Sequence, residues 1–174
     1  MNLPSKRVGK QLSVRELCLL ALIGALIFAT KAALAAIPNV NLNTTIIILT
    51  VVFFGWKALY AVGVYIMLEG LVFGFGIWWF SYLYVWPVIV VVAMIFRSND
   101  SAVVWAVLAG VYGLCFGPLM YILYFIINGW HMVFAMWVSG IPYDITFCIS
   151  NFILTLVLYR PLYSVMDRYV VRET

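Results

Sequence analysis

Three ionisable side chains stand inside long apolar stretches of this 174-residue chain: Lys31, Glu69 and Asp144. Burying an unpaired charge in hydrocarbon costs about 2.5–3.5 kcal/mol on insertion scales, so such residues are kept for pairing or for function. One ammonium group and two carboxylates can form a structural salt bridge, bind a polar solute or relay protons. We expect a binding site that uses at least two of the three, because one salt bridge leaves a carboxylate unmatched.

No other reactive constellation accompanies these charges. The sequence has no phosphate-binding glycine loop, no nucleophile–base set and no His or Cys spacing typical of a metal site. We interpret His131 as an interfacial residue and the three cysteines as small packing residues. The sequence therefore predicts no catalytic residue, no metal, no cofactor and no nucleic-acid partner.

The composition indicates which solvent surrounds the chain. Hydrophobic residues make up 67% and charged residues 9% of the sequence, whereas soluble domains carry roughly 25% charged residues. So few charges cannot cover the surface of a soluble globule, so we expect lipid around this chain. Residues 1–174 are predicted to form a single all-α integral-membrane domain.

Prolines, glycines and charges divide the chain into apolar segments that must position these residues. A membrane-spanning helix needs about 20 apolar residues, so the second segment is short enough to be oblique or to cross only part of the bilayer. Gly117-Pro118 predicts an interruption in the fifth. The first is longer than the apolar core of a signal peptide and is interpreted as a retained helix. The six predicted helices cover residues 16–37, 44–54, 58–75, 82–96, 102–127 and 142–159.

The basic residues predict the orientation of these helices. Connections 38–43, 76–81 and 128–140 contain no Lys or Arg. By the positive-inside rule this alternation predicts a compact bundle of six transmembrane helices with both termini cytoplasmic. Residues 1–15 and 161–174 would be cytoplasmic ends, and 16–160 the bundle. Basic residues occupy the other ends: Lys6, Arg7, Lys10, Arg15, Lys57, Arg97, Arg160, Arg168 and Arg172.

With this topology the three unusual charges fall at one level in the outer half of the bilayer. The aromatic run 74–87 would lie at the same level, where some rings belong to an ordinary interfacial belt and others face the charges. The segment 128–137 is interpreted as a second aromatic cap. Whether Lys31 pairs with Glu69, with Asp144 or with a ligand stays open. The predicted binding residues are Lys31, Asn39, Asn43, Glu69, Trp78, Trp79, Tyr82, Tyr84, Trp86, Asp144 and Asn151.

Two stripes of small residues could let another helix approach closely. The first predicted helix carries Ala21, Ala25 and Ala29, with Gly24 beside them. The fifth carries a similar stripe at Ala109, Gly113 and Gly117. One stripe can pack inside the bundle and the other can meet a partner protein, and spacing alone does not distinguish them.

Taken together, the pattern resembles the substrate-binding S component of an energy-coupling factor (ECF) vitamin transporter. The resemblance covers almost the whole chain and is a match of pattern, because the motifs of that family are loose. The segments that carry it are LALIGALIFATKAAL followed by IPNVNLNT, then FFGWKALYAVGVYIMLEGLVFGFGIWWFSYLYVWP, and SGIPYDITFCISNFILTLVLYRPLY.

The resemblance implies a function. An S component binds a water-soluble vitamin at the outer face of a prokaryotic cell membrane. It then docks on a transmembrane coupling subunit that is driven by two cytoplasmic ATPases, and topples to carry its site inward. By the same resemblance, Ala21, Ala25 and Ala29 would contact the coupling subunit, and connections 38–43 and 76–81 would act as lids.

The ligand is less closely defined. A pyridoxine-like compound is the leading expectation, with cobalamin and pantothenate as alternatives. A stand-alone small-solute carrier and an integral-membrane enzyme are the competing functional classes.

Overall fold

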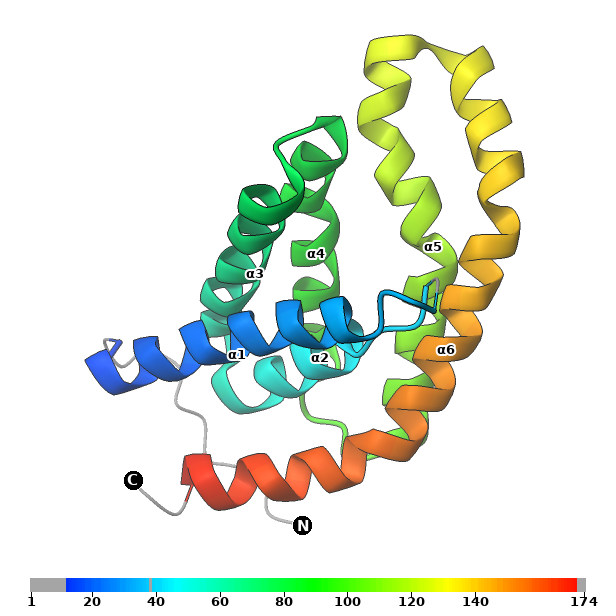
Figure 1. The fold of residues 1–174 in the computed structure, drawn as a ribbon. Helices are drawn as coiled ribbons and strands as arrows, with labels where there is room; N and C mark the ends of the chain where they lie inside the picture. The colour runs from blue at the N-terminus through cyan, green and yellow to red at the C-terminus, as the bar shows by residue number, and fades with distance from the viewer. Residues whose placement is uncertain (1–11, 38, 172–174) are drawn as a thin grey trace.

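The computed structural model describes residues 12–37 and 39–171. These residues form helices throughout: α1 (Val14–Ala33), α2 (Asn43–Phe54), the 3₁₀ turn η1 (Gly55–Lys57), α3 (Ala58–Phe73), α4 (Ile77–Ile95), α5 (Ala102–Asn128) and α6 (Trp130–Val171) (Figure 1). The predicted all-α class is therefore confirmed.

Five helical segments in the described part are long and apolar enough to cross a membrane. They are α1, the continuous segment Asn43–Phe73, α4, α5, and α6 as far as Arg168. The predicted count of six separate spans is not matched, because α2 has 12 residues and continues through η1 into α3. At about 1.5 Å per residue, α2 is too short to cross a bilayer alone.

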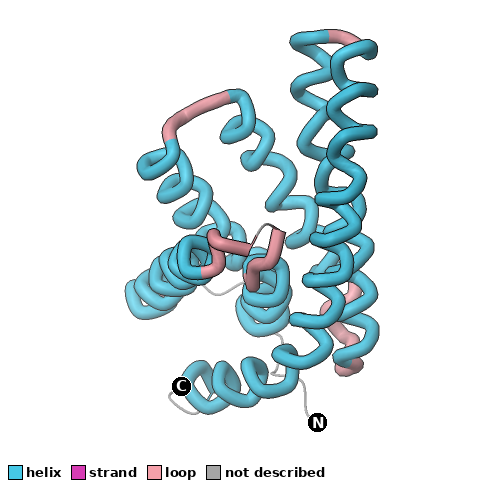
Figure 2. Tube along the Cα trace, turned by 45° about the vertical axis from the view of Figure 1, so that its right-hand side comes forward, coloured by secondary structure: helices cyan, strands magenta, loops and turns pink. Residues whose placement is uncertain are grey.

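The helices run in two directions (Figure 1). Helices α3, α4, α5 and the first part of α6 are roughly aligned, and α1, α2 and the end of α6 run across them. Figure 2 shows α5 and α6 as a long antiparallel hairpin that extends beyond the turn between α3 and α4. The aligned helices thus form two hairpins.

Helix α2 lies at the centre of the molecule. All 12 of its residues are buried, and it contacts α1, α3, α4, α5 and α6. A helix that is apolar on every side is stable only inside a protein or a membrane, and here the other helices surround it. The prediction treated this segment as an oblique or partial crossing of the bilayer and missed its central position.

The α5–α6 hairpin differs from the prediction in three places. Helix α5 continues through Pro118 without interruption. The predicted connection 128–140 is helical except for Gly129, whose φ of +76° reverses the chain within one residue. The predicted tail 161–174 is helical as far as Val171. The C-terminal part of α6 bends (Figure 1). Pro161 lies inside this part and accounts for the bend, because a proline in a helix removes one backbone hydrogen bond.

Candidate binding site

An ion pair joins the C-terminal end of α1 to the C-terminal part of α3. Helix α1 approaches α3 closely at Gly24, where a Cβ would lie 2.5 Å from the Ala61 carbonyl oxygen. This approach brings Lys31 Nζ within 2.6 Å of Glu69 Oε2. The Lys31 side chain is 31% exposed, whereas that of Glu69 is 1% exposed. The pair therefore leaves part of the lysine side chain exposed and hides the carboxylate.

Aromatic rings surround the ammonium group. Lys31 Nζ lies 5.4 Å from the ring centroid of Tyr82 and 5.8 Å from that of Phe73. Both distances are within the range of a cation–π interaction. Tyr82 also packs edge-on against Trp78 at 5.3 Å and against Trp86 at 5.8 Å between centroids. The predicted aromatic stretch thus supplies Tyr82, one of the two rings beside Lys31, whereas Phe73 precedes the stretch.

Beneath these rings lies a polar interior. Asn43, at the start of α2, donates from Nδ2 to the Tyr65 hydroxyl at 2.9 Å. Several buried polar atoms here lack a hydrogen-bond partner among the described residues, namely Asn43 Oδ1, Glu69 Oε1 and Trp86 Nε1. Buried polar groups are normally paired. These atoms therefore give the region a capacity for further hydrogen bonds.

A cavity of about 220 Å³ opens beside Lys31. Its wall is formed by the end of α1, by the connection that leads into α2, and by Phe73 of α3. Pockets for drug-sized ligands are usually roughly 300–1,000 Å³, so this cavity suits a smaller solute. The residues that line it are Lys31, Ala32, Leu34, Ala35, Ile37, Asn39, Val40, Asn41 and Phe73.

The connection that borders this cavity is tied to α6. Asn39 donates from Nδ2 to the Tyr143 carbonyl at 3.1 Å, and its own carbonyl accepts from Ser150 Oγ at 2.7 Å. Its φ of +57° is one that Asn adopts more readily than most residues. Asn41 closes a local turn by accepting from the Asn43 N–H at 3.2 Å. These bonds give this predicted lid a defined shape.

Asp144 has a different role from Glu69. It is 8% exposed and accepts a hydrogen bond from the Gly117 N–H of α5 at 3.1 Å. A Cβ at position 117 would collide with this carboxylate, so the glycine is required there. The question of which carboxylate pairs with Lys31 is thus answered in favour of Glu69.

Three other predicted residues fasten helices to one another. Trp79 donates from Nε1 to the Ile66 carbonyl of α3 at 2.8 Å. Tyr84 donates to the Leu119 carbonyl of α5 at 2.9 Å, and Asn151 donates to the Ala109 carbonyl at 3.3 Å. Of the predicted set, Glu69 and Tyr82 contact Lys31, and Asn39 lines the same cavity. Trp78 and Trp86 pack against Tyr82, and Asn43 binds Tyr65.

Sequence reasoning missed two residues of this neighbourhood, Tyr65 and Phe73. Both are four residues from Glu69, so helical periodicity places all three on one face of α3. The signal was present in the sequence but was hidden by the uniformly apolar composition of the segment.

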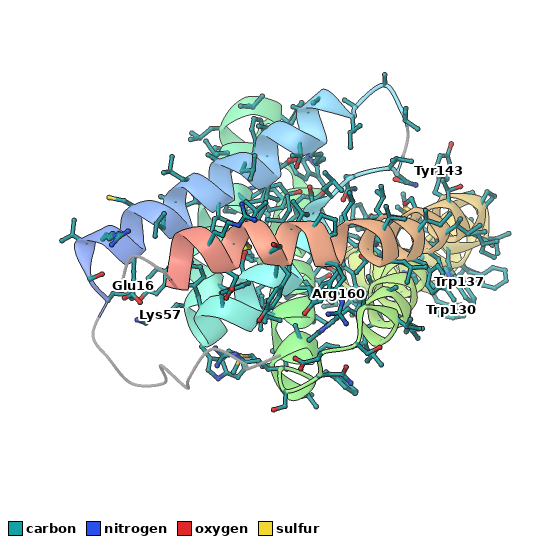
Figure 3. All side chains as sticks on the ribbon, turned by 90° about the horizontal axis from the view of Figure 1, so that it is seen from below. Glu16, Lys57, Trp130, Trp137, Tyr143 and Arg160 are labelled. Carbon is teal, nitrogen blue, oxygen red and sulfur yellow. The ribbon has the colours of Figure 1, made fainter. Side chains whose placement is uncertain are left out.

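A second, larger hollow lies near the end of the α5–α6 hairpin. Its volume is about 290 Å³, and aromatic and aliphatic side chains line it, including Tyr121, Phe125, Trp130 and Trp137. Trp130 begins α6 at the turn of this hairpin, and Figure 3 shows Trp130 and Trp137 on the α5–α6 side of the molecule. The wall contains no charged residue, so the hollow suits lipid better than a water-soluble molecule.

The two small-residue stripes have different environments. On α5, Ala109, Gly113 and Gly117 are buried, and a Cβ at Gly113 would lie 2.8 Å from the backbone of Phe147 in α6. On α1, Ala21 is half-buried while Ala25 and Ala29 are exposed. The α5 stripe is therefore used inside the molecule, and the α1 stripe is largely uncovered.

The end of the molecule away from the cavity carries basic side chains. Lys57 pairs with Glu16 at 2.8 Å (Figure 3). Arg97 donates to the Val52 carbonyl at the end of α2 at 3.1 Å, where a cation interacts favourably with the helix dipole. Partial burial lowers the pKa of the Arg97 guanidinium. Lys57, Arg97 and Arg160 are called the basic end below.

Comparison with known proteins adds no assignment: no protein-family model, no curated protein and no solved structure matches the chain. Within the described residues, no group of three His, Cys, Asp or Glu side chains could hold a metal ion. What the site can do must therefore be argued from its own geometry.

Proposed function

We propose that this chain is the membrane-embedded, solute-binding subunit of a vitamin uptake system, of the kind formed by ECF transporter S components. The observation that carries the proposal is the Lys31–Glu69 ion pair beside a cavity of about 220 Å³. A buried ion pair is rarely the most stabilising arrangement, because well-packed apolar residues of similar size often serve as well or better. A pair that is kept where it borders a cavity is therefore better explained by binding.

The arrangement of the chain supports a topology with both termini cytoplasmic. The first turn of α1 and the last turn of α6 lie near one another in two perpendicular views (Figures 1 and 3). Arg97 binds the end of α2, and Arg160 donates to the Asp100 carbonyl at 3.2 Å. These bonds hold the residues of the basic end on one side of the molecule. By the positive-inside rule this side faces the cytoplasm.

In this topology α2 returns the chain from the cavity to the cytoplasmic side. Asn43, at its start, contacts Tyr65 below the cavity, and Val52, near its end, contacts Arg97. Helix α2 thus links the cavity side to the basic end, and it runs across α3 and α4 rather than beside them (Figure 1).

The uncovered α1 stripe supports docking on a transmembrane coupling subunit, which two cytoplasmic ATPases would drive. Small residues let a partner helix approach closely in lipid, and Ala25 and Ala29 are exposed. The comparable stripe on α5 is already covered by α6, so α1 offers the remaining surface of this type.

The size of the cavity favours the smaller candidate vitamins. Pyridoxine-like compounds and pantothenate are small solutes, whereas cobalamin is much larger than a cavity of about 220 Å³. A stand-alone carrier and an integral-membrane enzyme stay as alternative classes. Co-purification separates them, because a subunit of this kind should bring down a membrane subunit and two ATPases.

A fluorescence titration tests the proposal. The purified protein in lipid nanodiscs is titrated with pyridoxine, pantothenate and cobalamin while tryptophan emission is followed. We expect saturable binding of one small vitamin, with most of the signal lost in Trp86→Phe because Trp86 packs against Tyr82 at 5.8 Å. Trp130→Phe is the matched control, since Trp130 lines the separate hollow.

A second measurement concerns the partner. Ala25→Leu should leave vitamin binding by the isolated protein unchanged and abolish co-purification of the coupling subunit. Absence of any saturable binding across a panel of water-soluble vitamins, with the protein folded, would reject the proposed function.

A further inference from the structure

The two residues of the ion pair beside the cavity differ in their exposure. The Glu69 side chain is 1% exposed and the Lys31 side chain 31% exposed, and the cavity wall includes Lys31 but not Glu69. A molecule in the cavity therefore meets the positive end of the pair first. A cationic group there would be repelled by the ammonium and could not reach the buried carboxylate.

The ammonium group keeps donors for a ligand. It carries three N–H donors, and among the described residues it makes one hydrogen bond, to Glu69 Oε2 at 2.6 Å. The other two donors therefore have no hydrogen-bond acceptor among the described residues. Carboxylate and phosphate oxygens make the strongest hydrogen bonds to such donors, because both partners are charged.

The rest of the cavity wall strengthens this preference. None of the described residues that line it is acidic, and its other polar side chains are the amides of Asn39 and Asn41. Amides can donate to an anion or accept from a hydroxyl group. The aliphatic and aromatic remainder, including Val40 and Phe73, suits the carbon skeleton of a small organic acid.

We propose that the cavity beside Lys31 selects solutes that carry one anionic group, a carboxylate or a phosphate, and rejects cations. The inference rests on the proposed function for the identity of the ligand as a small vitamin-like solute. It narrows that function, because the two intramembrane carboxylates could equally have indicated a cationic ligand. The anionic group can come from a soluble solute or from a lipid headgroup.

The test compares molecules that differ in charge at one position. Pantothenate is paired with pantothenol, its neutral alcohol, and 4-pyridoxate with pyridoxine. We expect the acid to bind about tenfold or more tightly than its neutral partner. The double variant Lys31→Gln with Glu69→Gln removes both charges without leaving a buried ion, and should reduce the preference to about twofold or less.

The control variant is Glu16→Gln with Lys57→Gln. This pair has a similar length, 2.8 Å, and lies at the opposite end of α1, away from the cavity. It should keep the full preference for the acid. A preference that persists in the Lys31 and Glu69 double variant, or tighter binding of the neutral partner by the unmodified protein, overturns the inference.

A second readout does not depend on any vitamin. Acetylation of Lys31 by an amine reagent is followed by peptide mass spectrometry, with inorganic phosphate or tetramethylammonium as the protecting ion and Lys57 as the internal reference. Phosphate should slow acetylation of Lys31 relative to Lys57, and tetramethylammonium should not. Equal effects of the two ions reject the anion site, whereas protection by phosphate without vitamin binding rejects only the proposed function.

The two sources of the anionic group are separated by the lipid. The same protection is measured in phosphatidylcholine nanodiscs with and without phosphatidylglycerol. Protection by soluble phosphate that is unchanged by phosphatidylglycerol assigns the site to a soluble solute. Protection by phosphatidylglycerol alone keeps the anion selectivity but assigns the cavity to a lipid headgroup.

Discussion

Within the described residues, two ion pairs join α1 to other helical segments, one at each end of α1. The two pairs differ in their surroundings. Glu16–Lys57 has side chains that are 22% and 15% exposed, and Lys31–Glu69 has side chains that are 31% and 1% exposed. In the first pair both charges share a moderate contact with solvent. In the second, one charge is buried completely and the other faces a cavity.

The first pair has a full structural explanation. Glu16 closes a capping box with Ser13, in which each side chain bonds to the backbone N–H of the other residue. Its carboxylate also binds Lys57. One residue thus starts α1 and ties it to η1, as expected of a charge at the edge of the apolar region.

The second pair has no comparable role in starting or capping a helix. Glu69 lies inside α3, caps no helix, and keeps Oε1 without a partner among the described residues. A structural pair would gain by satisfying this oxygen. The contrast teaches that the same two chemical groups satisfy local hydrogen bonds at one end of α1 and leave a buried acceptor without a partner at the other.

The largest difference between the pairs should appear when one partner is removed. Lys31→Ala leaves the Glu69 carboxylate buried and unpaired, and breaking a buried pair in this way costs about 3–5 kcal/mol. Lys57→Ala leaves Glu16 partly solvated and capped, so the cost should be about 1 kcal/mol or less. Reversible unfolding in mixed micelles, followed by tryptophan fluorescence, measures both free energies of unfolding.

A rescue variant controls this prediction. Glu69→Gln added to Lys31→Ala removes the unpaired charge and should recover most of the lost stability, whereas Glu16→Gln added to Lys57→Ala should recover little. Equal costs for the two lysine substitutions would show that Glu69 is as well solvated as Glu16, against its 1% exposure.

The next prediction concerns the contact that serves both pairs. Gly24 lies between the two ends of α1, and a Cβ there would meet the Ala61 carbonyl oxygen at 2.5 Å and Val64 at 2.8 Å. Gly24→Val should therefore push α1 away from α3 and cost about 1–3 kcal/mol through overpacking. Ligand binding should fall with it, because Lys31 can then no longer reach Glu69.

The neighbouring residue is the matched control. Ala25 is exposed, so Ala25→Val should change the free energy of unfolding by about 0.5 kcal/mol or less. If the two valine variants unfold alike, the close contact of α1 and α3 does not support the ion pairs.

How far the sequence predicts this fold depends on whether a signal is local. Helix-ending signals such as Gly55, which has a positive φ, fixed most boundaries to within a few residues. The prediction overlooked Gly74, so it carried the third helix to residue 75 and began the fourth at residue 82, whereas α3 ends at Phe73 and α4 begins at Ile77. Segment 43–54 was harder, because an apolar helix without a polar face looks the same when it crosses lipid and when other helices surround it. Pro142 was misleading, since a proline fits both the first turn of a helix and, at the cost of one hydrogen bond, its interior.

The candidate site follows the same rule. The cost of isolated charges identified Lys31, Glu69 and Asp144 without a structure, and helical spacing could have added Tyr65. Which carboxylate pairs with Lys31 depends on the approach of α1 to α3, which is a property of the packed molecule. For the same reason, the spacing of small residues did not show which stripe is covered. Helix α6 covers the stripe on α5, whereas Ala25 of the α1 stripe is exposed.

The smallest expected effect is the response of the two pairs to salt. The coupling energy of each pair is obtained from a double-mutant cycle with glutamine at both positions, at low and at high ionic strength. At about 1 M salt the Debye length is near 3 Å, so the Glu16–Lys57 coupling, expected at about 0.2–1 kcal/mol, should largely vanish. The Lys31–Glu69 coupling should change little, because solvent ions do not reach a carboxylate that is 1% exposed. A Lys31–Glu69 coupling that falls as steeply as the Glu16–Lys57 coupling would mean that salt enters the cavity as far as Glu69, and the two ends of α1 would then differ in their neighbours but not in their electrostatics.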